Sequence, residues 1–325
     1  MPQHAITANP GRSARPEPQA LGRLRFRRDL QSLAYLLAWP VLAAWQWRYG
    51  LSPLLYTLQL LLSIGIGVIH HNHAHLPMWR GRWLNRATDL WITLLQGHPT
   101  WVFAPAHMGN HHRHRHGPQD VARTYRFGGD RNDLLGWLMH PLHAVLAVYP
   151  LILRALKQLH RRQSAAYRWY ALQYALWLGS WSLLLVLDPW NALLLVIVPQ
   201  LFGLHWLLGA NYLQHAHADG HSPLDFARNF GGGVNLLFFN IGRHTAHHLQ
   251  PRLHWSLLPA LQQDIAPRLD PRLQEPGLLR YLLRVFVLGS VLPRYRSRSL
   301  MASAPAQVNS DQPLDASSPP ADSAR

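Results

Sequence analysis

Four long apolar runs constrain this chain more than any other feature of its sequence. They cover residues 30–47, 51–69, 170–187 and 192–210, and each is close to the ~17–25 residues that a helix needs to cross the hydrocarbon core of a bilayer. Only Arg48, Tyr49 and Gly50 separate the first two runs, and a turn at residues 188–191 separates the last two. We therefore expect an all-α integral membrane protein whose four transmembrane helices form two hairpins.

The distribution of arginine predicts the orientation of these helices. The formal net charge is +16, a value that by itself would also suit a nucleic-acid-binding protein. The two short turns, however, carry only Arg48, while the polar segments and both ends of the chain carry almost all the other basic residues. By the positive-inside rule, both termini and the polar segments face the cytosol, most simply across an inner membrane.

The polar segments predict the remaining organisation. Residues 1–29 are rich in Arg and Pro and are expected to form a disordered basic arm, and residues 296–325 a disordered tail. Between them, residues 30–295 form one membrane domain. Residues 70–133 and the chain after residue 210 supply a histidine-rich helical cap on the cytosolic side. His140, Pro141 and His143 interrupt the apolar stretch 134–153, so this stretch is expected to lie along the membrane surface.

Histidines gather in four groups within the cytosolic segments. Histidine occurs 22 times and cysteine not at all, which excludes thiolate metal sites and a cysteine nucleophile from this sequence. The four groups are His71-x-x-x-His75, His107-x-x-x-His111-His112, Asn211-x-x-x-His215 and His244-x-x-His247-His248. A spacing of three or four residues on a helix places two side chains on one face. One helical face in each group gives nine imidazoles: His71, His75, His107, His111, His112, His215, His244, His247 and His248.

Nine imidazoles are too many for one metal ion, but they fit two ions with four or five nitrogen ligands each. Imidazole suits iron, zinc, copper or nickel, so the histidines alone leave the metal open. The neighbouring His70 and His73 are expected to lie outside the ligand set, as possible hydrogen-bond donors to it. His140, His143 and His205 are expected to pack in the fold or to meet lipid head groups.

The order and spacing of these groups resemble the histidine boxes of the membrane fatty acid desaturase and hydroxylase superfamily. The resemblance extends over roughly residues 30–295. It implies a non-haem di-iron centre on a cytosolic cap above four spanning helices, with the nine histidines as ligands. It also implies that Asn211 contacts one metal ion through water. The implied activity is the oxygen-dependent oxidation of an unactivated C–H bond in a fatty acyl chain, with desaturation as the favoured outcome.

Several alternatives remain open at this point. The same site could decarboxylate a free fatty acid to a terminal alkene, or hydroxylate an acyl chain or a carotenoid. A metal-binding membrane transporter is the alternative from a different functional class, although the spans lack the ionisable residues that transport pathways usually contain, apart from His205. Without a haem motif or cysteines, the electrons are expected to come from a separate ferredoxin, rubredoxin or cytochrome. Chain length, regiochemistry, head group, donor and oligomeric state stay undetermined.

Overall fold

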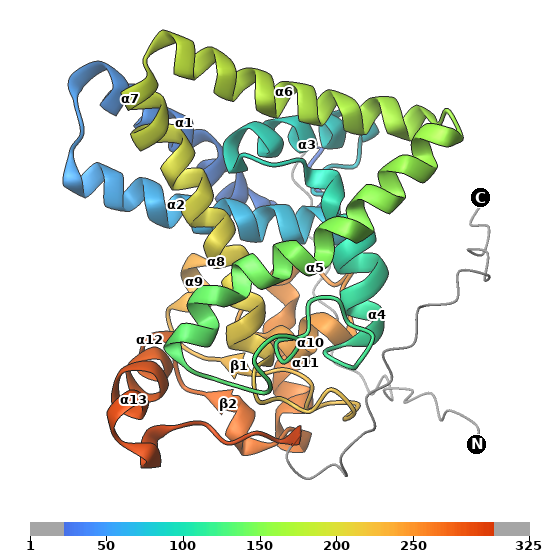
Figure 1. The fold of residues 1–325 in the computed structure, drawn as a ribbon, viewed down its shortest axis with the longest axis vertical. Coiled ribbons are helices and arrows are strands. Elements are labelled where there is room, and N and C mark those ends of the chain that lie inside the picture. Colours follow the sequence, from blue (N-terminus) through green and yellow to red (C-terminus); the bar gives the residue numbers. More distant parts are fainter. Residues whose placement is uncertain (1–22, 302–325) are drawn as a thin grey trace.

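The computed structural model describes residues 23–301, and this part of the chain is mostly helical (Figure 1). The long helices are α1 (Leu30–Tyr49), α2 (Pro53–His75), α3 (Arg82–Gln96), α5 (Leu134–Arg161), α6 (Ala165–Leu187) and α8 (Val198–His215). The short helices are α4 (His112–His114), α7 (Pro189–Ala192), α9 (Val234–Leu237), α10 (His244–Leu249), α11 (Leu258–Ile265), α12 (Leu278–Leu282) and α13 (Gly289–Val291).

The remaining regular elements are narrower or wider helical turns and one small sheet. Turns of 3₁₀ geometry are η1 (Arg27–Asp29), η2 (Thr100–Val102), η5 (Trp255–Leu257), η6 (Ala266–Arg268), η7 (Pro271–Leu273) and η9 (Pro293–Tyr295). Segments of π-helix are η3 (Ala104–His111), η4 (Leu193–Ile197) and η8 (Leu283–Leu288). The strands β1 (Asn229–Phe230) and β2 (Gln274–Glu275) pair in parallel, with Asn229 opposite Gln274.

Four helical segments are long and apolar enough to cross a membrane: α2, α5, α6 and the continuous run Pro189–His215 that comprises α7, η4 and α8. The outward side chains of these segments are largely apolar, and Leu54 and Val186 are 78% and 83% exposed. Exposed apolar surface on such a scale is expected where lipid replaces water as the solvent. The chain is therefore an integral membrane protein, as the sequence predicted.

The four segments differ from the four predicted spans in one member: α5 is among them, and α1, which covers the predicted span 30–47, is not. Helix α5 continues for 28 residues through Pro141 and Pro150, although the sequence favoured a surface position for this stretch. Proline is tolerated in long membrane helices because neighbouring helices support the backbone that it frees, and α5 packs against α8. Helix α1 packs against α2 as expected, but it is less apolar than the four segments above.

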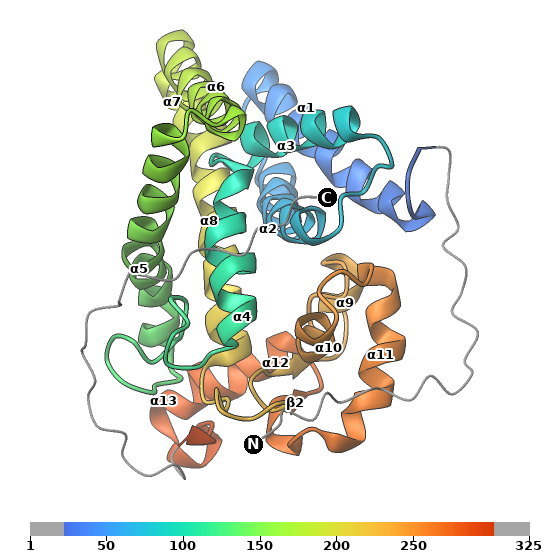
Figure 2. The ribbon, with the colours of Figure 1, turned by 90° about the vertical axis from the view of Figure 1, so that its right-hand side faces the viewer.

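The elements divide between two ends of the molecule. Helices α1, α2, α3 and α6 lie together at one end, and α9 to α13 gather at the other (Figures 1 and 2). Helices α5 and α8, which pack against each other, extend from the first end towards the second. The carboxyl end of α2, η3 with α4, the end of α8 and α10 meet between these ends, and each carries one of the four histidine groups.

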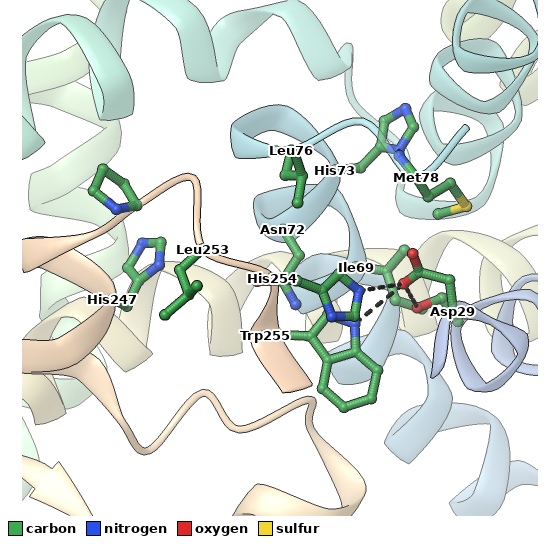
Figure 3. A pocket seen from close by; sticks show the side chains of 12 residues that line it. Asp29, Ile69, Asn72, His73, Leu76, Met78, His247, Leu253, His254 and Trp255 are labelled. Atoms are coloured by element: carbon green, nitrogen blue, oxygen red, sulfur yellow. Dashed lines mark hydrogen bonds and ion pairs between the residues drawn. The ribbon is translucent and has the colours of Figure 1, made fainter. Parts of the chain in front are cut away.

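The amino-terminal segment is ordered from Arg23, earlier than the boundary at residue 29 predicted from composition. Leu24 is buried and pairs with Trp79. The carboxylate of Asp29 accepts a hydrogen bond from Trp255 Nε1 (3.1 Å) and lies 3.3 Å from His254 Nε2 (Figure 3). These contacts fasten the start of α1 to the loop that follows α10. Residues 1–22 of the predicted arm lie outside the described residues.

The carboxyl-terminal segment is likewise ordered beyond the predicted boundary at residue 296. The hydroxyl of Ser297 lies 2.8 Å from His217 Nδ1, and the backbone N–H of Leu300 donates to the carbonyl of His217 (3.1 Å). Residues 296–301 therefore pack against the loop that follows α8. The rest of the predicted tail, residues 302–325, lies outside the described residues.

Candidate metal centre

The nine histidines singled out in the sequence converge into two neighbouring groups. Within each group, one ring nitrogen from every histidine lies within 4.8 Å of all the others. The first group contains His71, His75, His107, His112 and His247, and the second contains His111, His215, His244 and His248. Both groups consist of histidines alone. Their assignment as metal ligands remains a prediction, but their division into five and four is the division that two ions require.

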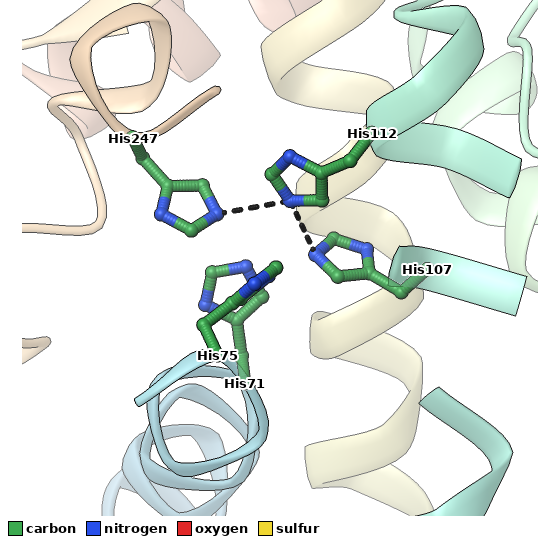
Figure 4. A group of neighbouring side chains, drawn as sticks. All are labelled: His71, His75, His107, His112 and His247. Atoms are coloured by element: carbon green, nitrogen blue, oxygen red, sulfur yellow. Dashed lines mark hydrogen bonds between the residues drawn. The ribbon is translucent and has the colours of Figure 1, made fainter. Parts of the chain in front are cut away.

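The first group is drawn from four elements, α2, η3, α4 and α10 (Figure 4). His71 and His75 lie one turn apart at the end of α2, as their spacing predicted. His112 Nε2 lies 3.0 Å from His107 Nε2 and 3.1 Å from His247 Nε2. Three ring nitrogens this close together can all face one shared cation when each offers its lone pair.

In the second group, too, the Nε2 atoms of neighbouring histidines lie close together. His244 Nε2 lies 3.0 Å from His215 Nε2 and 3.1 Å from His248 Nε2. His111 Nε2 is buried and has no hydrogen-bond partner among the described residues. Because a buried imidazole nitrogen without a partner is costly, this nitrogen indicates a ligand position.

The π-helical geometry of η3 explains how one short segment serves both groups. Ordinary helical spacing predicted His107 and His111 on one face, with His112 one residue further round. A π-helix bonds each residue to the one five positions on, so His107 and His112 share a face instead and both join the first group. His111 is directed to the second group. The predicted face was therefore wrong for this box, although all three histidines belong to the centre.

Helix α10 also divides its histidines, where the spacing had suggested that all three point the same way. His244 and His248 are one α-helical turn apart and join the second group, whereas His247 joins the first. Segments η3 and α10 thus each contribute to both groups. This sharing keeps the two groups side by side, as a dinuclear centre requires.

Burial keeps these imidazoles in the neutral form that a metal ion needs. Desolvation lowers the pKa of His107, His244 and His247 well below the ordinary value, and the surrounding imidazoles act in the same direction. The pKa of His248 is lowered for the same two reasons. Ligand histidines must be unprotonated on the coordinating nitrogen, so the site is already in a binding-competent protonation state.

Hydrogen bonds on the outer ring nitrogens orient three of the ligands. His111 Nδ1 donates to Asp120 Oδ2 (2.7 Å), and His215 Nδ1 donates to the carbonyl of Phe226 (2.7 Å). His71 Nδ1 lies 3.2 Å from Asn72 Oδ1. Such bonds hold the proton on Nδ1 and leave the Nε2 lone pair facing the metal. The donor set therefore fits two borderline ions such as iron.

Asp120 is a residue of the site that the sequence did not reveal. It is fully buried, and its carboxylate also accepts the backbone N–H groups of His116 (2.9 Å) and Ala122 (2.8 Å). Burial alone would raise the pKa of Asp120, but His111 and these N–H groups together hold it below its usual range. Asp120 is therefore an ionised carboxylate that orients the ring of His111.

We expect Asp120→Asn to lower activity by about 10- to 100-fold, the usual effect of losing such a partner. The amide can keep only part of this hydrogen-bond set, because its NH₂ group cannot accept. Oxidised product per iron-loaded chain is the measurement, and Asp264→Asn, at an exposed position, is the matched control. Full activity of Asp120→Asn would remove Asp120 from the site.

A segment after α8 braces the second group from two sides. Arg228 is 1% exposed, and its Nη1 donates to the carbonyls of Leu213 (2.9 Å) and Ala216 (3.0 Å) at the end of α8. A cation is favourable there because the carboxyl end of a helix carries partial negative charge. The next residue, Asn229, exchanges two hydrogen bonds of 2.9 Å with Thr245 in α10. Residues 226–229 thus contact α8 and α10, two of the three elements that carry the second group; the third is η3, which carries His111.

His70 and His73, which were expected beside the ligand set, form hydrogen bonds with the backbone. His70 Nε2 bonds to the carbonyl of Thr100 (2.9 Å), and His73 Nδ1 accepts the N–H of Met78 (3.1 Å). Neither belongs to either histidine group.

Asn211, expected to reach a metal ion through water, donates from Nδ2 to the carbonyl of Ala122 (2.7 Å). The same Nδ2 lies 3.2 Å from His140 Nε2. His140 is 3% exposed, so it is part of the site rather than a residue that meets lipid head groups.

A large apolar cavity runs past both groups. It has a volume of about 590 Å³, within the range of small-molecule binding sites. His71 and His107 of the first group line it, as do His111 and His244 of the second. Asn211 and His140 are also in its wall, which is otherwise formed mainly by aliphatic and aromatic side chains of α2, α5, α6 and α8. The cavity can hold a hydrocarbon chain next to the histidines.

Comparison with models of protein families identifies a match over most of the chain. The family model described as "Fatty acid desaturase" matches residues 45–276, a range that includes all nine histidines and most of the cavity. Comparison with curated protein sequences gives no match.

Proposed function

Because the chain belongs to the fatty acid desaturase family, we propose that it is a di-iron enzyme that uses O₂ to desaturate a fatty acyl chain. Membership of the family makes it an oxidoreductase of fatty acyl chains. What we propose beyond family membership is the reaction, desaturation, and the metal, iron. The observation that carries it is the pair of histidine groups, five and four, each of which contributes two histidines to the wall of one apolar cavity.

The two groups are proposed to hold one iron ion each. Bound iron would supply the oxygen chemistry that side chains cannot, since no acid or base removes hydrogen from an alkyl carbon. The protein itself positions the substrate chain and the histidine rings. The cavity excludes water and holds the chain against His71 and His244, while Asp120 and the carbonyl of Phe226 fix the rings of His111 and His215.

A separate protein is proposed to deliver the electrons. The sequence contains no cysteine for an iron–sulfur cluster, and the exposed Arg113 and Arg252 lie close in sequence to ligand histidines. A basic surface favours encounter with an acidic partner. In this proposal both termini and the centre face the cytosol and the protein resides in the inner membrane, as the positions of the arginines indicate.

Expression in a bacterial host, followed by analysis of lipids and headspace by mass spectrometry, tests the proposal. Desaturation removes two hydrogens from the product, hydroxylation adds one oxygen, and decarboxylation to an alkene loses one carbon as CO₂. We expect an unsaturated product from cells with the wild-type chain and none from cells with His244→Ala. A product that gains oxygen or loses a carbon would replace desaturation by one of the other two reactions. Identical profiles from both cell lines would refute the oxidase function.

A further inference from the structure

The large cavity can hold an acyl chain, but its described lining has no charged side chain to pair with a charged head group. Among the described residues that line it there is no Lys, Arg, Asp or Glu. An unpaired carboxylate is costly to bury. A charged head group must therefore lie in an adjoining space.

A small pocket adjoins the cavity and supplies that space. His140 and Ala144 of α5 line both the cavity and this pocket, so the two meet at one turn of the helix. The pocket has a volume of about 10 Å³, room for roughly one water molecule or an atom group of that size. Its other described lining residues are Val121, Arg123, Thr124, Arg126, Phe127 and His143.

The two arginines of the pocket form no ion pair among the described residues, although the buried carboxylate of Asp120 is near enough to stabilise the charge of Arg126 in part. Both are partly buried, and neither has a carboxylate within ion-pair distance in residues 23–301. Arg126 Nη2 donates to the carbonyl of Asp120 (3.3 Å), and Arg123 Nη1 donates to that of Pro118. The Nε of each is buried and has no partner in that part of the chain. Burial and the proximity of Arg123 lower the pKa of Arg126, so an anion between them would relieve repulsion.

Thr124 gives independent support for a ligand here. Its side chain lines the pocket and is only 6% exposed, yet its hydroxyl has no hydrogen-bond partner among the described residues. A buried hydroxyl normally has a partner. An oxyanion in the pocket could accept from this hydroxyl and from the two free Nε–H groups.

We propose that Arg123, Thr124 and Arg126 bind the carboxylate of a free fatty acid whose chain enters the cavity between His140 and Ala144. The inference rests on the proposed function and specifies its substrate class. The pocket has room for about one oxygen atom of a head group, and a small planar carboxylate can place one there while its other atoms stay in the adjoining cavity, which the bulkier phosphates of a thioester or phospholipid head group would do less readily. Charge-assisted hydrogen bonds from two guanidinium groups are the usual means of holding this group.

The position of the pocket has a consequence for the reaction. His140 bonds to Asn211, and the carbonyl that Arg126 contacts belongs to Asp120, the partner of His111. The carboxyl end of the substrate therefore lies on the side of the cavity near the second histidine group. We expect the oxidised carbons to be close to the carboxyl group.

Binding to the full-length, iron-loaded protein in phosphatidylcholine nanodiscs, without an electron donor, tests the head-group site without turnover. The probes are dodecanoate, its methyl ester and dodecyl phosphate. In Arg123→Gln/Arg126→Gln we expect the Kd for dodecanoate to rise at least about tenfold, with the methyl ester unaffected. Thr124→Val, nearly equal in shape, should weaken dodecanoate binding by a smaller factor. Arg161→Gln, at an exposed position at the far end of α5, should change neither.

Several outcomes would overturn the inference. One is equal weakening of the acid and the ester, which would indicate a general loss of structure, and another is no weakening of the acid. Wild-type protein that binds dodecyl phosphate more tightly than dodecanoate would assign the pocket to a phosphate head group instead. Arginine-dependent binding of dodecanoate without any oxidation would support the carboxylate site and refute the proposed reaction. Oxidation confined to the distal half of the chain would refute the placement of the carboxyl group.

Discussion

Replacement of His111, His215 or His247 by alanine is expected to abolish turnover. Each substitution removes one imidazole from a buried group that the remaining chain cannot complete, and activity at such a centre depends on its ligand geometry. The measurement is oxidised product per chain in isolated membranes. The variants should still insert, because the apolar faces of the four spanning segments are unchanged. A variant that keeps more than about a tenth of the wild-type rate, roughly 1.4 kcal/mol of barrier, would remove that residue from the ligand set.

His114→Ala is the matched control for these variants. His114 lies in the same short helix as His112 but belongs to neither group. It should therefore retain measurable activity, and so should His73→Ala. Loss of activity in either control, equal to that of His111→Ala, would show that the ligands of that box are wrongly assigned.

Elemental analysis of the purified protein is expected to give two iron ions per chain. The division of the histidines into two groups predicts how substitutions in one group change the iron content. The double variant His107→Ala/His112→Ala removes two of five nitrogens from the first group, and His244→Ala/His248→Ala removes two of four from the second. Each should lower the iron content from about two to about one, because the other group keeps all its nitrogens.

The iron content also tests the proposal as a whole. Wild-type protein with a single ion per chain, or with zinc in an active preparation, would falsify the di-iron centre. Loss of both ions in each double variant would show that the two groups cannot be loaded separately.

Helical spacing in the sequence identified the nine histidines that come together, but not which of them share a group. At the end of α2 the geometry is α-helical, and His71 and His75 share one group as the four-residue spacing predicts. In η3 the geometry is π-helical, and the pairing changes to His107 with His112. A single sequence gives little indication of a π-helix, so this assignment required the three-dimensional structure.

Residues that act through hydrogen bonds were harder to predict than ligands. Asp120 is the only carboxylate between residues 91 and 129, and a lone acid in a histidine-rich segment could have served as a signal. Arg228 gave no such signal, because it is one of many arginines and its role depends on the fold that buries it. The length of α5, which is sufficient to span a membrane, was missed for a related reason: the support that α8 gives to a proline-containing helix is tertiary.

The brace at residues 226–229 limits how this centre could be rebuilt on another scaffold. In this one segment, the carbonyl of Phe226 accepts a hydrogen bond from the ring of His215. The side chain of Arg228 donates to a carbonyl at the end of α8, and that of Asn229 donates to Thr245 in α10. A designer who transplanted only the histidines would move the ligands without the part that sets the distance between their helices. Designed sites fail most often when the supporting residues are omitted. The smallest transferable unit of the second group is therefore the end of α8, residues 226–229 and α10, together with the end of η3 that carries His111.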